Sequence, residues 1–265
     1  MSPWSTPVSP TATPALVTDP SARDATTADM DTAGRSGRIW LDVPFQEKDA
    51  AKAAGAHWDQ RARRWYAPRR DVAGLERWLP QPGLPTVLPG EDRQFGLGPG
   101  GVPLFVDLVP SSCWFTNVRS CVGPRDWDRV RRMVYGRAGR RCEACGRPAD
   151  PSRRIWLEAH ERWEYDTEPT EPMWARLGLP VQRLKRLVCL CTLCHEATHF
   201  GLASLRGRDD AAMRHLMEVN GWTRAQANEH ISAAFDLFEE RSRTEWLLDL
   251  RILLHAGVEP LPPHI

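Results

Sequence analysis

The chain has 265 residues, 42% hydrophobic and 26% charged, so it can bury folded cores and is not a disordered protein. Its formal net charge is only +1, which argues against an indiscriminately basic coat protein for nucleic acids. No apolar run approaches the roughly 18 residues that span a bilayer, so we expect no membrane partner.

The first 37 residues predict a solvated, disordered tail. They contain five prolines and twelve serines or threonines, without the basic start and apolar stretch of a secretory signal. The seven cysteines of the chain, an odd number, include two C-x-x-C pairs, which favours a reducing compartment and metal binding over disulfides. We therefore expect a cytoplasmic protein.

Residues 38–79 predict a small αβ module. Its predicted elements, in chain order, are a strand (39–43), a short helix (45–54), a second strand (63–66) and a second short helix (72–79). Arg63 and Arg64 lie beside Trp65 and Tyr66, which suits phosphate contact and base stacking in a nucleic acid. The same pattern fits aromatic side chains in a core with the arginines in solvent, and this second interpretation is favoured.

The string WLDVPFQEKDAAKAAGAHWDQRARRWYAP resembles a short domain of unknown function found in plasmid-borne primase, topoisomerase-like and mobilisation proteins. The resemblance covers about residues 38–70. It implies an accessory role in handling nucleic acid and does not imply a particular reaction.

Residues 80–112 contain seven prolines and six glycines and predict a linker between domains, with one extended strand over 102–109 that docks onto the second domain. Pro124 and Gly139 bound a predicted helix over 124–139. The C-terminal part predicts three helices, over 211–219, 224–240 and 243–255, the last two opened by the capping-box patterns T-x-x-Q and S-x-x-E.

The two C-x-x-C pairs predict a structural zinc site. They are separated by 45 residues and consist of Cys142, Cys145, Cys191 and Cys194. Each pair brings two thiolates to one ion at about 2.3 Å, and two pairs complete a tetrahedral site. The gap exceeds the usual zinc-ribbon spacing, so we expect a folded segment between the pairs.

Three histidines near the second pair predict a further metal site. His195 and His199 share one face of a helix that begins at the second pair, and His160 follows a strand-like segment between the pairs. Three imidazoles on a divalent ion leave positions open for water or a phosphate oxygen. The ion is Mg²⁺, Mn²⁺ or Zn²⁺, and we expect no small-molecule cofactor.

Residues 124–200 resemble the HNH, or ββα-metal, nucleases, in the subtype with a four-cysteine zinc site. The strings that carry the resemblance are WDRVRRMVYGRAGRRCEACG, LEAHERW and RLVCLCTLCHEATH. The resemblance implies that His160, His195 and His199 are metal ligands. It places Glu161 at the position of the general base and Arg186 at the position of the family's asparagine, and both residues depart from the family pattern.

The sequence therefore predicts a metal-dependent endonuclease acting on DNA. Glu161 would activate water, and Arg186 would stabilise the charge on the scissile phosphate, with three further arginines as phosphate contacts (Arg140, Arg141 and Arg162). A second hypothesis is a non-catalytic zinc-binding module of a plasmid or mobile element that contacts nucleic acid or a protein. A third places a second structural zinc on the histidines with Cys189 as the fourth ligand.

The predicted fold class is α+β. In chain order we expect a disordered tail (1–37), the αβ module (38–79), a Pro/Gly-rich linker (80–112), a zinc-stapled ββα-metal core (113–207) and C-terminal helices packed on that core (208–265).

Overall fold

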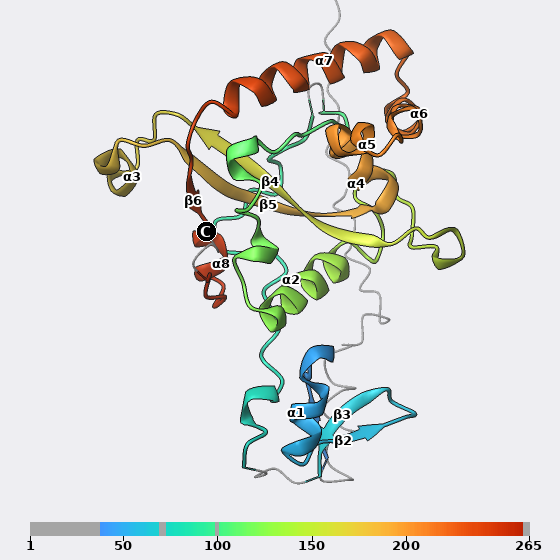
Figure 1. Ribbon diagram of the computed structural model, residues 1–265, viewed down its shortest axis with the longest axis vertical. Coiled ribbons are helices and arrows are strands. Elements are labelled where there is room, and N and C mark those ends of the chain that lie inside the picture. Colours follow the sequence, from blue (N-terminus) through green and yellow to red (C-terminus); the bar gives the residue numbers. More distant parts are fainter. Residues whose placement is uncertain (1–37, 69–72, 99–100, 262–265) are drawn as a thin grey trace, which may run out of the picture. The chain divides into compact units, whose positions relative to one another are not determined.

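The computed structural model describes residues 38–68, 73–98 and 101–261, so the predicted tail lies outside the described residues. The chain divides into two units, Met1–Pro80 and Gln81–Ile265, and each is considered by itself. Both combine helices with a small three-stranded sheet, so the protein is mixed α+β, as predicted (Figure 1). No helix among the described residues is long and apolar enough to cross a membrane.

The smaller unit is a three-stranded antiparallel sheet with short helical segments on one face. Its elements are β1 (Ile39–Leu41), η1 (Phe45–Glu47), α1 (Lys48–Ala53), β2 (His57–Asp59), β3 (Arg64–Ala67) and η2 (Glu76–Trp78), with sheet order β1-β3-β2. The core contains Leu41, Ala51, Leu75 and Trp78, all buried. Ala51 is the one buried residue of α1, so the rest of the helical contribution to this core comes from Leu75 and Trp78.

In the smaller unit one strand was not predicted, and one predicted helix needs correction. The strand β2 was not expected, and it forms because its residues pair with β3 in the register His57↔Tyr66. The helix predicted over 72–79 is reduced, among its described residues, to the single turn η2, which follows the left-handed Gly74.

The larger unit is built around a long two-stranded hairpin, with a third short strand at one edge. Its elements are η4 (Ser111–Cys113), η5 (Val118–Ser120), α2 (Pro124–Arg137), η6 (Pro151–Arg153), β4 (Leu157–Asp166), α3 (Pro172–Leu177), β5 (Val181–Cys191), α4 (Thr192–Thr198), α5 (Phe200–Leu205), α6 (Asp209–Asn220), α7 (Arg224–Arg241), β6 (Leu247–Asp249) and α8 (Arg251–Leu254). The sheet order is β4-β5-β6; β4 and β5 pair antiparallel, and β5 and β6 pair parallel.

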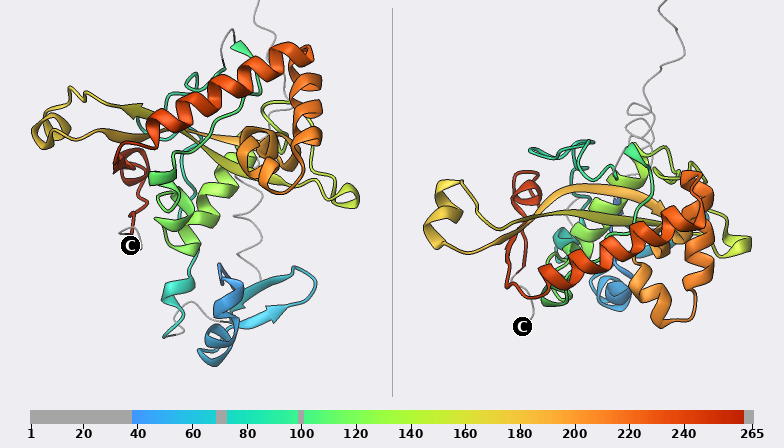
Figure 2. Two further views of the ribbon diagram at one scale, coloured as in Figure 1. Left: turned by 45° about the horizontal axis from the view of Figure 1, so that its top comes forward. Right: turned by 90° about the horizontal axis from the view of Figure 1, so that it is seen from above.

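The hairpin separates two hydrophobic cores, one on each face. On one face Val188 and Leu190 pack with residues of α4, α5, α6 and α7. On the other face Trp163 and Leu187 pack with α2 and α8. The ribbon in Figure 2 shows α7 on one side of the hairpin and α2 on the other. A β-bulge lies between Arg162 and Trp163, where Arg162 pairs with Arg186 and Trp163 pairs with Leu184, so Lys185 is the extra residue.

The interpretation of residues 80–112 as a linker is wrong, because the described part of this segment belongs to the larger unit. Leu88, Leu104 and Val106 are almost fully buried in its two cores. Residues 102–109 dock onto the unit as predicted, but they form no strand. Side chains hold them instead: Asn220 exchanges two hydrogen bonds with Leu104, and His230 Nε2 accepts the N–H of Val106 at 2.9 Å.

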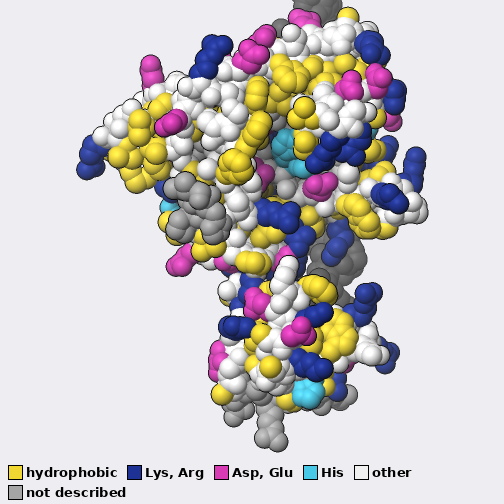
Figure 3. All heavy atoms as spheres, in the orientation of Figure 1, with side chains coloured by type: hydrophobic (Ala, Val, Ile, Leu, Met, Phe, Trp, Pro, Cys, Tyr) yellow, Lys and Arg dark blue, Asp and Glu magenta, His cyan; other side chains and the backbone are white. Residues whose placement is uncertain are grey.

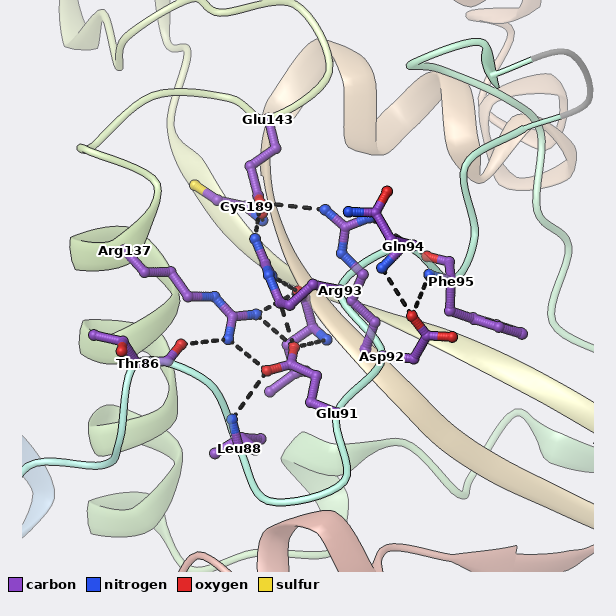
Figure 4. A network of polar contacts seen from close by, with 12 residues as sticks. Thr86, Leu88, Glu91, Asp92, Arg93, Gln94, Phe95, Arg137, Glu143 and Cys189 are labelled. Atoms are coloured by element: carbon purple, nitrogen blue, oxygen red, sulfur yellow. Dashed lines mark hydrogen bonds and ion pairs between the residues drawn. The ribbon is translucent and has the colours of Figure 1, made fainter. Parts of the chain in front are cut away.

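A buried carboxylate fixes the first part of the same segment (Figure 4). The side chain of Glu91 has no exposed surface, and Arg137 of α2 donates to both of its oxygens at 2.7 Å. The backbone N–H groups of Leu187 and Leu88 donate to the same carboxylate at 3.0 and 3.1 Å. This contact ties residues 86–93 to both α2 and β5.

The C-terminal helices are partly as predicted. α6 and α7 form, and Thr223 and Gln226 make the expected capping box at the start of α7. The helix predicted over 243–255 forms only in its last part, as α8 (Arg251–Leu254). Ser242 is the C-cap of α7, and Leu247–Asp249 is the strand β6. The pairing of β6 with Val181–Arg183 satisfies backbone groups that a helix would have bonded internally.

Candidate metal centre and its surroundings

The candidate site lies where β5 leads directly into α4. Cys191 is both the last residue of β5 and the N-cap of α4, so one strand–helix junction carries a thiol and then two histidines. The start of β4 is tied to this junction, because Thr192 N–H donates to the carbonyl of Trp156 and Trp156 N–H donates to Thr192 Oγ1. The three elements β4, β5 and α4 are therefore held as one unit.

The four cysteines of the two C-x-x-C pairs converge. Their sulfur atoms all lie within 4.8 Å of one another, and Cys145 Sγ is 3.7 Å from Cys191 Sγ. A tetrahedral zinc site with bonds of about 2.3 Å requires neighbouring sulfurs about 3.8 Å apart. The first pair turns back on itself: Gly146 N–H donates to the carbonyl of Cys142, and the positive φ of Gly146 brings the carbonyl of Arg147 back to Cys142 N–H. The cluster fits one zinc ion.

Two of the four thiols ionise more readily than usual, whereas hydrogen bonding with those two raises the pKa values of Cys191 and Cys194. Hydrogen bonding with Cys145 opposes the shift, but donation from Cys191 and Cys194 lowers the pKa of Cys142 to about 6. The pKa of Cys145 is also lowered, by hydrogen bonds from the other three thiols. His215 of α6 lies behind the cluster, with Nε2 3.1 Å from Cys194 Sγ. A ring N–H at this position can donate to a zinc-bound thiolate.

The three predicted histidines also converge, at a place separate from the cysteines. His160 comes from β4, and His195 and His199 come from α4 and its C-cap. Their ligand atoms lie within 4.8 Å of one another, and the ring centroids are 4.7 to 5.2 Å apart. His160 is 2% exposed, whereas His195 and His199 are only partly buried, so the cluster reaches the surface. In Figure 3 histidine side chains are visible on the larger unit beside basic ones.

The hydrogen bonds around these rings suit metal ligands. Glu158, two residues before His160, has an oxygen 3.1 Å from His195 Nδ1, which leaves Nε2 of His195 for an ion. This carboxylate–histidine arrangement is usual behind metal-ligating imidazoles. Nδ1 of His160 is buried and has no hydrogen-bond partner in the described protein, so the ring has an unsatisfied nitrogen.

Burial keeps the three imidazoles neutral. Desolvation, together with the positive charges of Arg162 and the neighbouring histidines, lowers the pKa of His160 well below its usual value. The same causes lower the pKa of His199 to about 3. Burial also lowers the pKa of His195, although Glu158 opposes the shift. Neutral imidazole is the form that binds a metal ion.

Glu161, the predicted general base, does not join the histidines. Adjacent residues of a strand point to opposite faces, so Glu161 points away from the face that carries His160. One of its oxygens accepts the N–H of Val118, on the side of α2. Burial raises the pKa of Glu161 to about 7, but the carboxylate does not face water at the histidine site.

The two hairpin arginines that were predicted to contact phosphate are buried. Arg162 pairs with Asp107 at 3.0 Å, and one of its nitrogens is 3.3 Å from His160 Nε2. Arg186 is paired with Glu143 at 3.3 Å. Both point to the face of His160 and face each other across the strands, so their charges need these carboxylates. Neither is free to contact a phosphate from solvent.

The other predicted contacts are placed as follows. Arg140 and Arg141 are exposed immediately before the first cysteine pair, and Arg63 and Arg64 are exposed in the smaller unit. Cys189 lies in the core beside α2 and is not among the ligand atoms of the histidine cluster. The interpretation of Cys189 as a fourth ligand of that cluster is therefore wrong.

Three residues of the site were missed in the sequence: Glu158, Asp107 and His215. The sequence could have identified Glu158, because residues two apart on a strand share a face and Glu158 lies two residues before His160. Asp107 and His215 act across 55 and 21 residues, and no local pattern identifies them.

Comparisons with known proteins concern a small part of the chain. Residues 38–80 match the family model described as a domain of unknown function, DUF5710. Two proteins named DNA primase TraC, both from Escherichia coli, are each 52% identical, over 48 and 50 residues. These segments are 18% of this chain and only 3% and 5% of those proteins. No solved structure matches the chain.

Proposed function

We propose that the larger unit is an HNH-like, metal-dependent endonuclease that hydrolyses phosphodiester bonds in DNA. The observation that supports this most directly is the convergence of His160, His195 and His199 from a strand and the following helix onto one partly exposed point. The similarity of the smaller unit to a segment of a DNA primase supports DNA as the substrate and a plasmid or mobile element as the setting.

The residues of the site would have distinct tasks. The three imidazoles would hold a divalent ion, which polarises a phosphoryl oxygen and stabilises the leaving oxygen when bound. Glu158 would orient His195 through Nδ1. The exposed Arg140 and Arg141 remain the proposed phosphate contacts, whereas Arg162 and Arg186 would contribute a positive potential from beneath the site.

The alternative is a zinc-binding module that contacts nucleic acid or a partner protein without turnover. The position of Glu161 favours it, because the residue at the base position faces the opposite core. Under this alternative the histidines would serve as a second structural site.

Plasmid nicking with a panel of Mg²⁺, Mn²⁺ and Zn²⁺ tests the proposal. We expect divalent-dependent nicking that His199→Ala abolishes and that His255→Ala retains, because His255 is exposed and outside both clusters. Absence of cleavage of duplex and single-stranded DNA with every metal would refute the nuclease. Salt-dependent DNA binding that His199→Ala leaves unchanged would then support the alternative.

A further inference from the structure

One face of the smaller sheet carries a row of aromatic rings that crosses all three strands. The register places Tyr66 of β3 between Trp40 of β1 and His57 of β2. The ring centroids of Trp40 and Tyr66 are 6.1 Å apart, and those of His57 and Tyr66 are 5.6 Å apart with nearly parallel planes. Each ring therefore has an aromatic neighbour on the adjacent strand.

This row is not part of the hydrophobic core of the smaller unit. The core lies on the opposite face, where Leu41 and Ala67 pack with Ala51 of α1 and where Trp65 is also directed. His57 is exposed, and Trp40 and Tyr66 are half-buried. Trp65 and Tyr66, adjacent in sequence, thus have different surroundings: Trp65 contributes to the core and Tyr66 to the aromatic row.

Two exposed arginines lie over the rings. The guanidinium carbon of Arg38 is 4.6 Å from the Tyr66 centroid, and that of Arg64 is 5.3 Å from the Trp40 centroid. Arg38 pairs with Asp59 at 3.0 Å, and Arg64 lies 3.9 Å from Asp42. Exposed ion pairs of this kind are weak and screened by salt, so a polyanion can compete for both guanidinium groups.

We propose that this face binds single-stranded DNA, with bases stacked on Trp40, Tyr66 and His57 and with phosphates bound by Arg38 and Arg64. Every base has a face that stacks on an aromatic ring, so binding would be tolerant of sequence. A guanidinium plane that stays over a ring can itself stack on a base. Stacking and phosphate contact alone do not distinguish DNA from RNA. We commit to DNA because the unit that carries this face is similar to a segment of two proteins named DNA primase. This inference does not depend on nuclease activity.

Fluorescence anisotropy of the full chain with a labelled oligothymidylate, without added divalent metal, tests the inference. Tyr66→Leu should weaken binding about fivefold or more, as expected for the loss of one stacked base. Tyr66→Phe, which keeps the ring, should bind like the unsubstituted chain. The double variant Arg38→Gln/Arg64→Gln should lower the slope of log K against log salt by roughly 0.7 for each phosphate that the protein no longer neutralises.

Matched controls come from the same unit. Phe45 is an exposed ring with Lys48 4.4 Å from its centroid, on η1 and outside the sheet. Arg77 is an exposed arginine over Trp78 on η2. Phe45→Leu and Arg77→Gln should leave binding unchanged, and far-UV circular dichroism checks that all variants remain folded.

Three results would overturn the inference. If the double arginine variant and Tyr66→Leu both bind the oligonucleotide with an affinity within twofold of that of the unsubstituted chain, this face is not the DNA-binding site. An equal loss in Arg77→Gln would show a general charge effect, and an equal loss in Phe45→Leu would show that the loss is not specific to the aromatic row. If the substitutions weaken the binding of duplex and single-stranded DNA equally, or if the matching RNA binds more tightly than the DNA, single-stranded DNA would be excluded as the occupant.

Discussion

Substitution of Glu91 by Gln tests whether the segment after residue 80 is an integral part of the larger unit. The Glu91 carboxylate has no exposed surface and accepts four hydrogen bonds, two from Arg137 and one each from two backbone N–H groups. A carboxamide offers one oxygen and one NH₂ group, so at least one donor would face another donor. Arg137 would also keep its charge with 5% of its side chain exposed.

Removal of one partner from a buried ion pair costs about 3–5 kcal/mol. For a unit of this size we expect the melting temperature to fall by about 6–20 °C, measured by differential scanning calorimetry. Asp128→Asn is the matched control, since Asp128 pairs with Arg131 on the same helix but both side chains are more than 40% exposed. This control should cost less than about 1 kcal/mol.

The dependence of stability on pH gives a second readout for Glu91. Burial opposes the shift, but hydrogen bonds from Arg137 and the backbone lower the pKa of Glu91 below its usual value. The stabilising contribution is therefore present above the unfolded-state pKa and is lost as pH falls through the lower folded-state pKa. Equal melting temperatures for Glu91→Gln and Asp128→Asn would refute the reasoning, because the buried pair would then be worth no more than an exposed one.

Three further predictions concern the metal sites and the docked segment. Cys194→Ser should abolish stoichiometric zinc measured by atomic emission, while Cys121→Ser, a buried thiol outside the cluster, should retain it. Glu158→Gln should weaken divalent binding at the histidines about 10–100-fold by calorimetry, whereas the exposed Glu168→Gln should not. Burial lowers the pKa of His230, so the stabilising contribution of this side chain should decrease as the pH falls below the unfolded-state pKa of about 6.5. In a His230→Gln variant the free energy of unfolding, measured by chemical denaturation, should therefore decrease less steeply as the pH is lowered.

The elements fixed by local patterns could be predicted from the sequence. The two C-x-x-C pairs, the helix after Pro124 and the i, i+4 spacing of His195 and His199 each depend on neighbours within one or two turns. The convergence of His160 with the other two was predicted from a strand opposite that helix, and the resemblance to HNH nucleases implied it too. The structure brings the three rings together.

The predictions that were wrong depended on distant partners. Arg162 of β4 and Arg186 of β5 are charged residues inside strands, and the distant Asp107 and Glu143 make their burial possible. Residues 243–255 have a helical pattern, but the free edge of β5 provides a better partner for Leu247–Asp249. Glu161 is different, because the sequence alone could have shown the error: adjacent residues of a strand point to opposite faces, so Glu161 cannot share a face with His160.

The bulge at Lys185 has a consequence for insertions and deletions in this hairpin. Because of the extra residue, Leu184 shares a face with Trp163, while Arg186 shares a face with His160. Deletion of Lys185 would therefore remove the bulge and leave Leu184, Arg183 and Gln182 on their present faces. Deletion of the paired Leu184 would instead place Arg183 opposite Trp163, on the face of the aromatic core. The hairpin can thus lose its bulged residue without exchanging its two faces, but it cannot lose a paired one.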